Sequence, residues 1–371
     1  MENYSTTVVG LDVHKESIAA ASLPPGLDCA TEHMKIENNP IAIEKLVRRV
    51  AARGPVEFVY EAGPCGYEVH RQITALGHKC TVIAPALTPV RPGDRVKTDR
   101  RDAEKLARYQ RAGELTAIRV PTREEEAARD LVRVREDGVS DRLRARHRLA
   151  KFFLRQGRVY RETKSWGVAH RAWVKSQRFE WQPLQQSFEA NVRAVEEAEA
   201  RLAVLDQQLQ DLSQTAIYRE PVRYLRCLKG IDTLGALTLV VEAQEFRRFG
   251  KARTFMGYTG LVVSEFTSSF KPRRGRITKA GNEHIRRILV EGAWGYRGRN
   301  MVSQAVAERR KGCPPEVVRL AQKAQDRLHR KFSRMISRGK LPQVTVVAVA
   351  RELAGFVWSI AGHFPTTAKL N

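Results

Sequence analysis

Apolar positions in the first 120 residues form short runs that alternate with stretches of helical periodicity. The runs rich in β-branched or other apolar residues lie at 8–13, 18–23, 34–36, 56–60 and 80–83. Apolar residues instead recur every three or four positions over about 40–53 and 67–76. Short apolar runs predict strands, and the wider spacing predicts amphipathic helices. The pattern therefore predicts a mixed α/β sheet that opens with a β-hairpin.

The residues after this sheet are predicted to be mainly helical. Prolines and glycines at 85–93 indicate a loop, and a helix is predicted over 99–111. Apolar positions from 184 to 212 come close to heptad spacing, which predicts a long helix with a coiled-coil seam. Leu202, Leu205 and Leu209 lie on that seam, and we expect it to contribute to oligomerisation.

The C-terminal part begins near residue 221 and is predicted to be mainly helical to about 364. The stretch 254–279 is the exception, because it is rich in glycine, serine and threonine and is expected to form loops and short turns. Three parts result. They are a mixed-sheet domain at 1–120, a basic helical and coiled-coil region at 121–216, and a C-terminal helical domain at 217–371.

The net charge of the chain indicates which class of partner the protein binds. The chain carries 65 lysines and arginines against 41 acidic residues, a net charge of +24 at pH 7. Such an excess is expected of a protein that binds a polyanion. We expect no membrane partner, because no apolar stretch approaches the length that spans a bilayer. A cytoplasmic location is expected, since the N-terminus lacks the basic and apolar regions of an export signal. The five cysteines show no CxxC spacing, which argues against disulfides and a zinc site.

Four carboxylates are candidates for metal chemistry. Asp12 interrupts an apolar strand, where a lone carboxylate costs free energy, and Glu61 stands at the end of another strand. Asp99 and Asp102 are three residues apart at a helix start, so they share one face. Together the four would form an all-oxygen cluster of the kind that Mg²⁺ or Mn²⁺ prefers. Two such cations can stabilise the attacking and leaving oxygens of a phosphodiester displacement.

Most of these acids also have an ordinary structural interpretation. Asp99 suits a helix N-cap, because Thr-Asp before a helix is a start signal. Asp102 suits the first helical turn, where an acid complements the helix dipole, and Glu61 suits a cap of the following turn. Asp12 is the hardest to explain in this way. The ordered set therefore favours a metal site.

The residues around these acids resemble the signature of a known family. The three segments are Gly10-Leu11-Asp12-Val13-His14-Lys15, Tyr60-Glu61-Ala62-Gly63-Pro64-Cys65-Gly66 and Lys97-Thr98-Asp99-Arg100-Arg101-Asp102-Ala103. They look like the DEDD motifs of bacterial insertion-sequence transposases with a RuvC-like, RNase H-like N-terminal domain. Pilin-gene DNA invertases and bridge-RNA-guided recombinases belong to the same group. The resemblance covers nearly the whole chain and implies that Asp12, Glu61, Asp99 and Asp102 bind divalent metal.

Hydroxyl and arginine residues follow the apolar run 260–263. Taken alone, the serines of 264–269 beside Arg273, Arg274 and Arg276 suit phosphate chemistry, and equally a basic loop that only contacts DNA. The family resemblance implies more. The C-terminal domain of that family carries Gly-Leu-Val-Pro, Ser-Ser-Gly and Gly-Arg-Ile-Thr-Lys-x-Gly-Asn segments, and a serine there attacks DNA to form a phosphoserine link.

The register of that resemblance selects the serine. Counting back from residues 275–279 places Ser268 on the second serine of the pattern. Ser269 is the alternative nucleophile, because Ser269-Phe270 stands where Gly-Gly is usual, and Ser264 is a third candidate. A serine hydroxyl needs activation, and the acidic metal site is the evident activator. We expect the two domains to supply one composite active site, within one chain or across subunits.

Further segments are predicted to contact nucleic acid. Residues 225–237 resemble a helix-hairpin-helix whose turn presents backbone amides to a phosphate, although Asp232 replaces the usual second glycine. An ordinary helical hairpin in the core is the alternative. From 142 to 178, twelve lysines and arginines are interleaved with aromatic residues, a mix that tracks phosphates and stacks on exposed bases. A solvated basic helix with core aromatics is the alternative there. The assigned contact residues are Lys229, Gly230, Arg273, Arg274, Arg276, Lys279, Arg144, Arg148, Lys151 and Arg155.

The sequence as a whole favours a transposase or site-specific recombinase that cuts and rejoins double-stranded DNA. A metal-dependent Holliday-junction-type endonuclease is the first alternative, and it would have no need of the serine segment. A non-catalytic nucleic-acid-binding protein is the second, but its carboxylates would repel phosphates unless metal neutralised them. The family resemblance further implies a structured guide RNA. We also expect a homo-oligomer, either a dimer or a tetramer.

Overall fold

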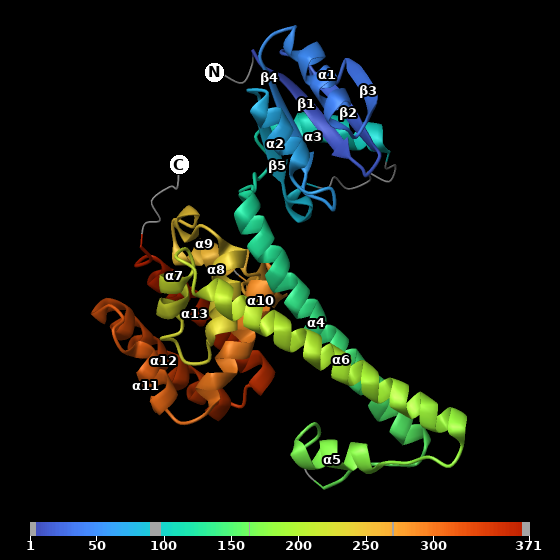
Figure 1. The fold of residues 1–371 in the computed structure, drawn as a ribbon. Helices are drawn as coiled ribbons and strands as arrows, with labels where there is room; N and C mark the ends of the chain where they lie inside the picture. The colour runs from blue at the N-terminus through green and yellow to red at the C-terminus, as the bar shows by residue number, and fades with distance from the viewer. Residues whose placement is uncertain (1–4, 90–97, 163, 269–270, 366–371) are drawn as a thin grey trace. The chain divides into compact units, whose positions relative to one another are not determined.

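The computed structural model describes residues 5–89, 98–162, 164–268 and 271–365 (Figure 1). Contacts between Cα atoms divide the chain into two compact units, Met1–Pro121 and Thr122–Asn371. Each unit has its own buried core, so each is described by itself.

Unit 1 is built on a five-stranded mixed sheet. Its strands are β1 (Thr7–Val13), β2 (Ser17–Leu23), β3 (Glu32–Glu37), β4 (Val56–Glu61) and β5 (Lys79–Ile83). The order is β3-β2-β1-β4-β5, with β1, β4 and β5 parallel to one another and with β2 antiparallel to its two neighbours. The predicted mixed α/β sheet with an opening hairpin is confirmed. The topology is consistent with the RNase H-like fold that the family resemblance implied.

Three helices cover this sheet on both faces (Figure 1). They are α1 (Pro40–Ala51), α2 (Glu68–Ala75) and α3 (Asp99–Arg111). Because side chains alternate along a strand, Val9 packs with the first two helices and its neighbour Val8 packs with α3. Even-numbered positions of β1 therefore face α3.

Unit 2 opens with two long helices that pair along their length (Figure 1). They are α4 (Arg123–Arg155) and α6 (Gln182–Ser213), and the short α5 (Val168–Ser176) lies between them in sequence. A capping box of Thr122 and Glu125 starts α4 by satisfying two orphan backbone amides. Arg135 pairs with Asp206, and Arg146 pairs with Glu199, so the two helices run antiparallel.

The coiled-coil seam of α6 packs inside the chain, which corrects the expectation that it joins subunits. Leu202, Leu205 and Leu209 are at most 8% exposed. Leu202 and Leu205 lie beside Gly138 of α4, and the absence of a side chain at Gly138 lets α4 and α6 approach closely. Leu209 belongs to the core of unit 2. Heptad spacing here reflects an intramolecular helical pair.

The rest of unit 2 is a helical bundle with one β-hairpin. The helices are α7 (Arg219–Leu225), α8 (Thr233–Ala243), α9 (Ala252–Tyr258), α10 (Glu283–Ala293), α11 (Gln304–Arg310), α12 (Pro315–Ser337) and α13 (Pro342–Ala361). The hairpin consists of β6 (Val263–Ser268) and β7 (Lys271–Ile277), and we call it the serine hairpin. The expectation of loops and short turns over 254–279 was therefore wrong. Valine, phenylalanine and threonine favour strands, and this preference outweighs the glycine and serine content.

One helix of the described residues, α13, is long and apolar enough to span a membrane by length and composition alone. This finding corrects the expectation that no apolar stretch reaches that length. Half of its most apolar window is buried inside the protein, where the helix packs against α9, α10 and α12. A core helix of a water-soluble protein passes the same test.

Candidate functional site

Asp12 is placed by a close contact between β1 and α3. Gly10, two residues earlier on the same face of the strand, lies so near α3 that an added Cβ would be 1.9 Å from the carbonyl oxygen of Ala103. Glycine at this position lets the helix backbone touch the strand. Asp12 follows Gly10 on that face, and Asp99 precedes Ala103 by one helical turn. The contact therefore brings the start of α3 to the end of β1.

Asp12, His14 and Asp99 form a cluster at this crossing. One ligand atom of each residue lies within 4.8 Å of the other two. His14 Nε2 is 3.2 Å from Asp12 Oδ2 and 3.6 Å from Asp99 Oδ1. The hydroxyl of Thr98, and not Asp99, caps α3 by accepting from the Arg101 amide, so the N-cap interpretation of Asp99 was wrong. The Asp99 carboxylate is therefore not needed as a cap.

Electrostatics at the cluster suit a cation. Burial raises the pKa of Asp12, and the charges of Asp99 and Asp102 raise it further, while His14 acts in the opposite direction. The mutual repulsion of carboxylates costs free energy that a divalent cation would remove. Oxygen donors with one imidazole are a ligand set that Mn²⁺ accepts, and carboxylates alone suit Mg²⁺. The donor set thus fits the expected metal.

Glu61 and Asp102 lie around the cluster without joining the three-residue group. Glu61 ends β4, whose Tyr60 is level with Leu11 of β1, so Glu61 and Asp12 occupy adjacent strand ends. By alternation both side chains face α3. The Thr88 hydroxyl donates to Glu61 Oε1 at 2.8 Å. Asp102 lies in the first turn of α3 and contributes through its charge to the raised pKa of Asp12.

His14 is the member of the site that the sequence interpretation missed. Its position directly after β1 and two residues after Asp12 was the available signal. The histidine stood within the quoted motif but was not proposed as a ligand. Its side chain is 53% exposed, so burial gave no indication of its role.

The structure describes the candidate serines unequally. Ser268 ends β6 and pairs with Lys271 of β7, but its side chain, like the whole of Ser269, lies outside the described residues. The Ser264 hydroxyl donates to the carbonyl of Arg276 at 3.2 Å. Ser264 is therefore engaged in holding the two strands together, which argues against its role as nucleophile.

The serine hairpin is anchored at its base. The Lys279 amide donates to the carbonyl of Gly260, and the Asn282 amide donates to the carbonyl of Tyr258. Gly281 has a φ of +79°, and an added Cβ would be 2.1 Å from the Tyr258 carbonyl oxygen. The predicted contact residues Arg273, Arg274 and Arg276 are exposed on β7, and Lys279 is exposed two residues after it.

Asn282 connects the hairpin base to α4. Its side-chain oxygen caps α10, and its Nδ2 donates to Glu242 Oε2 at 2.7 Å. Glu242 is a buried carboxylate on α8, and Arg133 of α4 holds both of its oxygens at 2.8 and 3.0 Å. Two donors satisfy the buried charge, as burial requires. The base of the serine hairpin is thus tied to the long helical pair.

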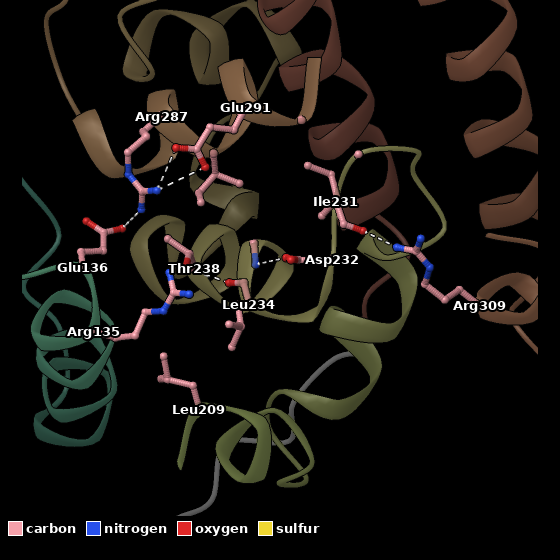
Figure 2. Close-up of a pocket in the computed structure, with 14 residues that line it drawn as sticks. Arg135, Glu136, Leu209, Ile231, Asp232, Leu234, Thr238, Arg287, Glu291 and Arg309 are labelled. Atoms are coloured by element: carbon pink, nitrogen blue, oxygen red, sulfur yellow. Dashed lines mark hydrogen bonds and ion pairs between the residues drawn. The ribbon is translucent and has the colours of Figure 1, made fainter. Parts of the chain in front are cut away.

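The turn between α7 and α8 lies beside the pocket of Figure 2, with Leu228 and Ile231 buried in the core of unit 2 and with Gly230 and Asp232 exposed. Gly230 has a φ of +85°, and an added Cβ would be 2.1 Å from the Gly292 carbonyl oxygen. Asp232 caps the Gly235 amide, and Arg309 donates to the Ile231 carbonyl. Residues of both charges line the adjoining pocket of about 430 Å³. The contact with Gly292 suits a core hairpin, but Gly230 itself is exposed, so DNA contact by Lys229 and Gly230 stays a prediction.

The aromatic residues of 142–178 pack with one another, which corrects the expectation that they stack on exposed bases. Phe152 and Phe153 are at most 4% exposed and pack with Phe188. Arg146 covers the Trp166 ring at 4.6 Å. The aromatic residues therefore form a small core between α4, α5 and α6. The assigned basic residues Arg144, Arg148, Lys151 and Arg155 remain exposed around it.

The mixed sheet, with acids at the ends of β1 and β4 and at the start of α3, defines a nuclease-like domain of the DEDD type. A model of the DEDD transposase domain of IS110 elements matches residues 9–156. A second model, described as transposase of the IS116/IS110/IS902 family, matches residues 222–306. The chain belongs to this family of transposases, as the sequence resemblance indicated.

Relatives that span nearly all of the chain support the same assignment. A putative transposase, y4qE, of Sinorhizobium fredii is 38% identical over 97% of this chain and 89% of its own length. The transposase for insertion sequence element IS1533 of Leptospira borgpetersenii is 34% identical over 87% of this chain and 95% of its own. The protein is thus an enzyme that acts on DNA, cutting and rejoining it.

Proposed function

We propose that this transposase exchanges DNA strands through a phosphoserine intermediate. Asp12, Glu61, Asp99 and Asp102 hold Mg²⁺ or Mn²⁺, and Ser268 is the nucleophile, with Ser269 as the alternative. The observation that carries the metal site is the cluster of Asp12, His14 and Asp99 at the crossing of β1 and α3. A bound cation would neutralise charge on the phosphodiester oxygens and lower the barrier to displacement.

The residues of the chain have separate tasks in this reaction. Ser268 Oγ forms an ester bond to phosphorus while the bond from phosphorus to the leaving sugar oxygen breaks. The serine proton passes to a general base, and the leaving oxygen takes up a proton. Arg273, Arg274 and Arg276 of the serine hairpin bind the backbone phosphates. Attack by a second DNA hydroxyl reverses these steps and rejoins the strands without a nucleotide cofactor.

An endonuclease that uses water is the second candidate, because the acidic cluster alone supports hydrolysis. It leaves the serine hairpin and its arginines without a chemical task.

The family resemblance also supports a structured guide RNA and a homo-oligomer, a dimer or a tetramer. Sequencing of RNA that co-purifies with the protein tests the first of these, and light scattering tests the second.

The covalent intermediate gives the experiment that separates the two candidates. Wild-type protein with duplex DNA that carries its element ends is expected to form an adduct that survives denaturation, because a phosphoserine ester is covalent. Ser268→Ala is expected to lose the adduct and keep nearly all DNA affinity, which lies mainly in phosphate contacts. Ser264→Ala is the matched control and is expected to keep the adduct. DNA cleavage without any adduct, unchanged by Ser268→Ala or Ser269→Ala, would establish the hydrolytic candidate.

A further inference from the structure

Helix α12 has two different faces. Its apolar face packs in the core of unit 2, and the residues of that face are Val317, Ala321, Ala324, Leu328 and Phe332. The opposite face is exposed along the whole helix and bears Lys323, Arg327, Arg330, Ser333, Arg334, Ser337 and Arg338. Neither family model reaches this helix, since the second match ends at residue 306. The basic face therefore has no assigned role.

Some of its charges are already paired. Arg319 pairs with Glu316 of the same helix. Glu352 of α13 accepts from Arg327 at 2.8 Å and from Lys331 at 2.6 Å. Arg327 and Lys331 therefore stabilise the packing of α12 on α13, and Arg319 stabilises the first turn of α12.

The remaining charges form no such ion pair, although the charge of Arg330 acts on Asp326 one helical turn earlier. Within the part of the chain that the structure describes, no salt bridge or side-chain hydrogen bond engages Lys323, Arg330, Arg334 or Arg338. Three arginines with the helical spacing of four residues form a continuous row from Arg330 to Arg338. The row spans about 12 Å along the helix axis.

A groove runs beside this row. It has a volume of about 470 Å³ and is lined by Asn300, Asp326, His329, Arg330, Ser333 and Arg334, with Ser337 at the end of the helix. Hydrogen bonds from Asn300 and Gln322 lower the pKa of Asp326, and the charge of Arg330 lowers it further. That carboxylate is committed to holding the Asn300 loop at one end of the groove. The remaining lining includes Arg330, Arg334 and the Ser333 hydroxyl, which can donate hydrogen bonds to phosphate, while the Ser337 hydroxyl donates to the Arg334 carbonyl.

We propose that the row Arg330, Arg334 and Arg338, with the adjoining groove, binds the phosphate backbone of duplex DNA. A transposase must hold its substrate DNA, and charge complementarity selects a polyanion for this face. Over about 12 Å a DNA duplex carries roughly seven phosphates, enough to meet every arginine of the row. The described exposed residues of this face include no aromatic side chain. A partner held by base stacking, as single-stranded RNA is, is therefore a poorer match.

The experiment compares two pairs of arginines on the same helix. Arg330→Gln/Arg334→Gln removes two unpaired cations, and Arg319→Gln/Arg327→Gln removes two paired ones with the same change in net charge. Fluorescence anisotropy measures the affinity for a duplex DNA and for a hairpin RNA of equal length over a series of salt concentrations. Neither the metal nor Ser268 is needed for this binding, so failure here would leave the proposed chemistry standing.

The expected result is a specific loss in the first pair. Its DNA affinity falls several-fold, and the slope of log affinity against log salt decreases in magnitude by about 2, since each phosphate contact contributes about 0.9. The control pair keeps nearly the wild-type slope, although loss of the Arg327–Glu352 ion pair lowers its melting temperature, and the first pair keeps the wild-type melting temperature. Equal losses in the two pairs, or no loss in the first, would overturn the proposal. A loss confined to the RNA would overturn the assignment to DNA.

Discussion

The acidic cluster of unit 1 and the serine hairpin of unit 2 are held by different kinds of contact. At the cluster, Gly10 lies against the backbone of α3, where an added Cβ would be 1.9 Å from the Ala103 carbonyl oxygen. In the hairpin, an added Cβ on Gly275 would meet the Ser264 hydroxyl at 2.4 Å. A hydroxyl can rotate away, but a helix backbone cannot. The cluster is therefore built rigidly into a core, and the hairpin is fixed mainly at its base.

The largest effect is expected from substitutions in the acidic cluster, which remove catalysis, whereas a substitution in the serine hairpin mainly weakens DNA affinity. Asp12→Asn or Asp99→Asn is expected to lower strand exchange by about 1,000-fold or more, because several kcal/mol of transition-state stabilisation depends on the metal. Arg273→Gln in the serine hairpin is expected to weaken DNA binding only several-fold, since it removes one phosphate contact. A strand-exchange assay and a DNA-binding assay on the same proteins measure both.

The control for the acidic variants is Glu16→Gln, which changes the same charge at a side chain that is 87% exposed. It is expected to keep wild-type activity. The metal-free Asp12→Asn protein is expected to melt at the wild-type temperature or above, since the variant relieves carboxylate repulsion. Full activity in both acidic variants would refute the four-acid site.

The acidic cluster and the serine hairpin also differ in how well the sequence predicted them. Asp12 stood out because a charged residue in an apolar strand is anomalous, and α3 was predicted with its observed bounds. The strands of unit 1 were predicted because burial imposes a clear apolar pattern on them. His14 was missed because an exposed histidine shows no such anomaly.

The serine hairpin was not predicted as a hairpin, because its sequence carries little apolar alternation, and its residues 263–265 and 273–277 are exposed or half-buried. The role of the α6 seam was misjudged for another reason. Heptad spacing indicates that a helix pairs, but it does not say whether the partner is the same chain or another. Gly138 of α4 faces the leucines of that seam, a contact between residues too distant in sequence to be predicted from local pattern.

Two glycine substitutions, for which moderate effects are expected, test the two kinds of contact directly. Gly10→Ala is expected to destabilise the protein by about 1–3 kcal/mol, because the methyl group forces α3 away from β1. Gly275→Ala is expected to cost about 1 kcal/mol or less, because only the hydrogen bond of Ser264 is disturbed. Urea unfolding measures both. Equal losses would show that the hairpin is packed as rigidly as the cluster.

The smallest expected effect concerns pH at His284 of α10, which lies two residues after Asn282 and pairs with Glu136 of α4. The hydrogen bond with Glu136 raises the pKa of His284 above its ordinary value of 6.5, and the charge of Glu242 adds to the rise, while burial and Arg133 oppose it. Stabilisation from this histidine is complete below pH 6.5 and is lost as pH rises through the raised pKa. His284→Gln is therefore expected to be less stable than wild type at about pH 6, by roughly 1 kcal/mol, and nearly equal at about pH 9.

Thermal unfolding of both proteins at the two pH values measures this difference. The loss caused by Gly10→Ala is expected to be the same at both, because that contact involves no titrating group. If the stability difference between wild type and His284→Gln did not shrink with rising pH, the stabilisation by protonated His284 would be contradicted.

Metal binding by the cluster is the most direct test of the central claim. Calorimetric titration of Mn²⁺ into the wild-type protein without DNA is expected to show saturable binding. The Asp12→Asn/Asp99→Asn variant is expected to bind at least about 10-fold more weakly, and Glu16→Gln is expected to bind as wild type does. Mn²⁺ affinity in the double variant equal to that of the wild type would contradict a metal centre at the crossing of β1 and α3.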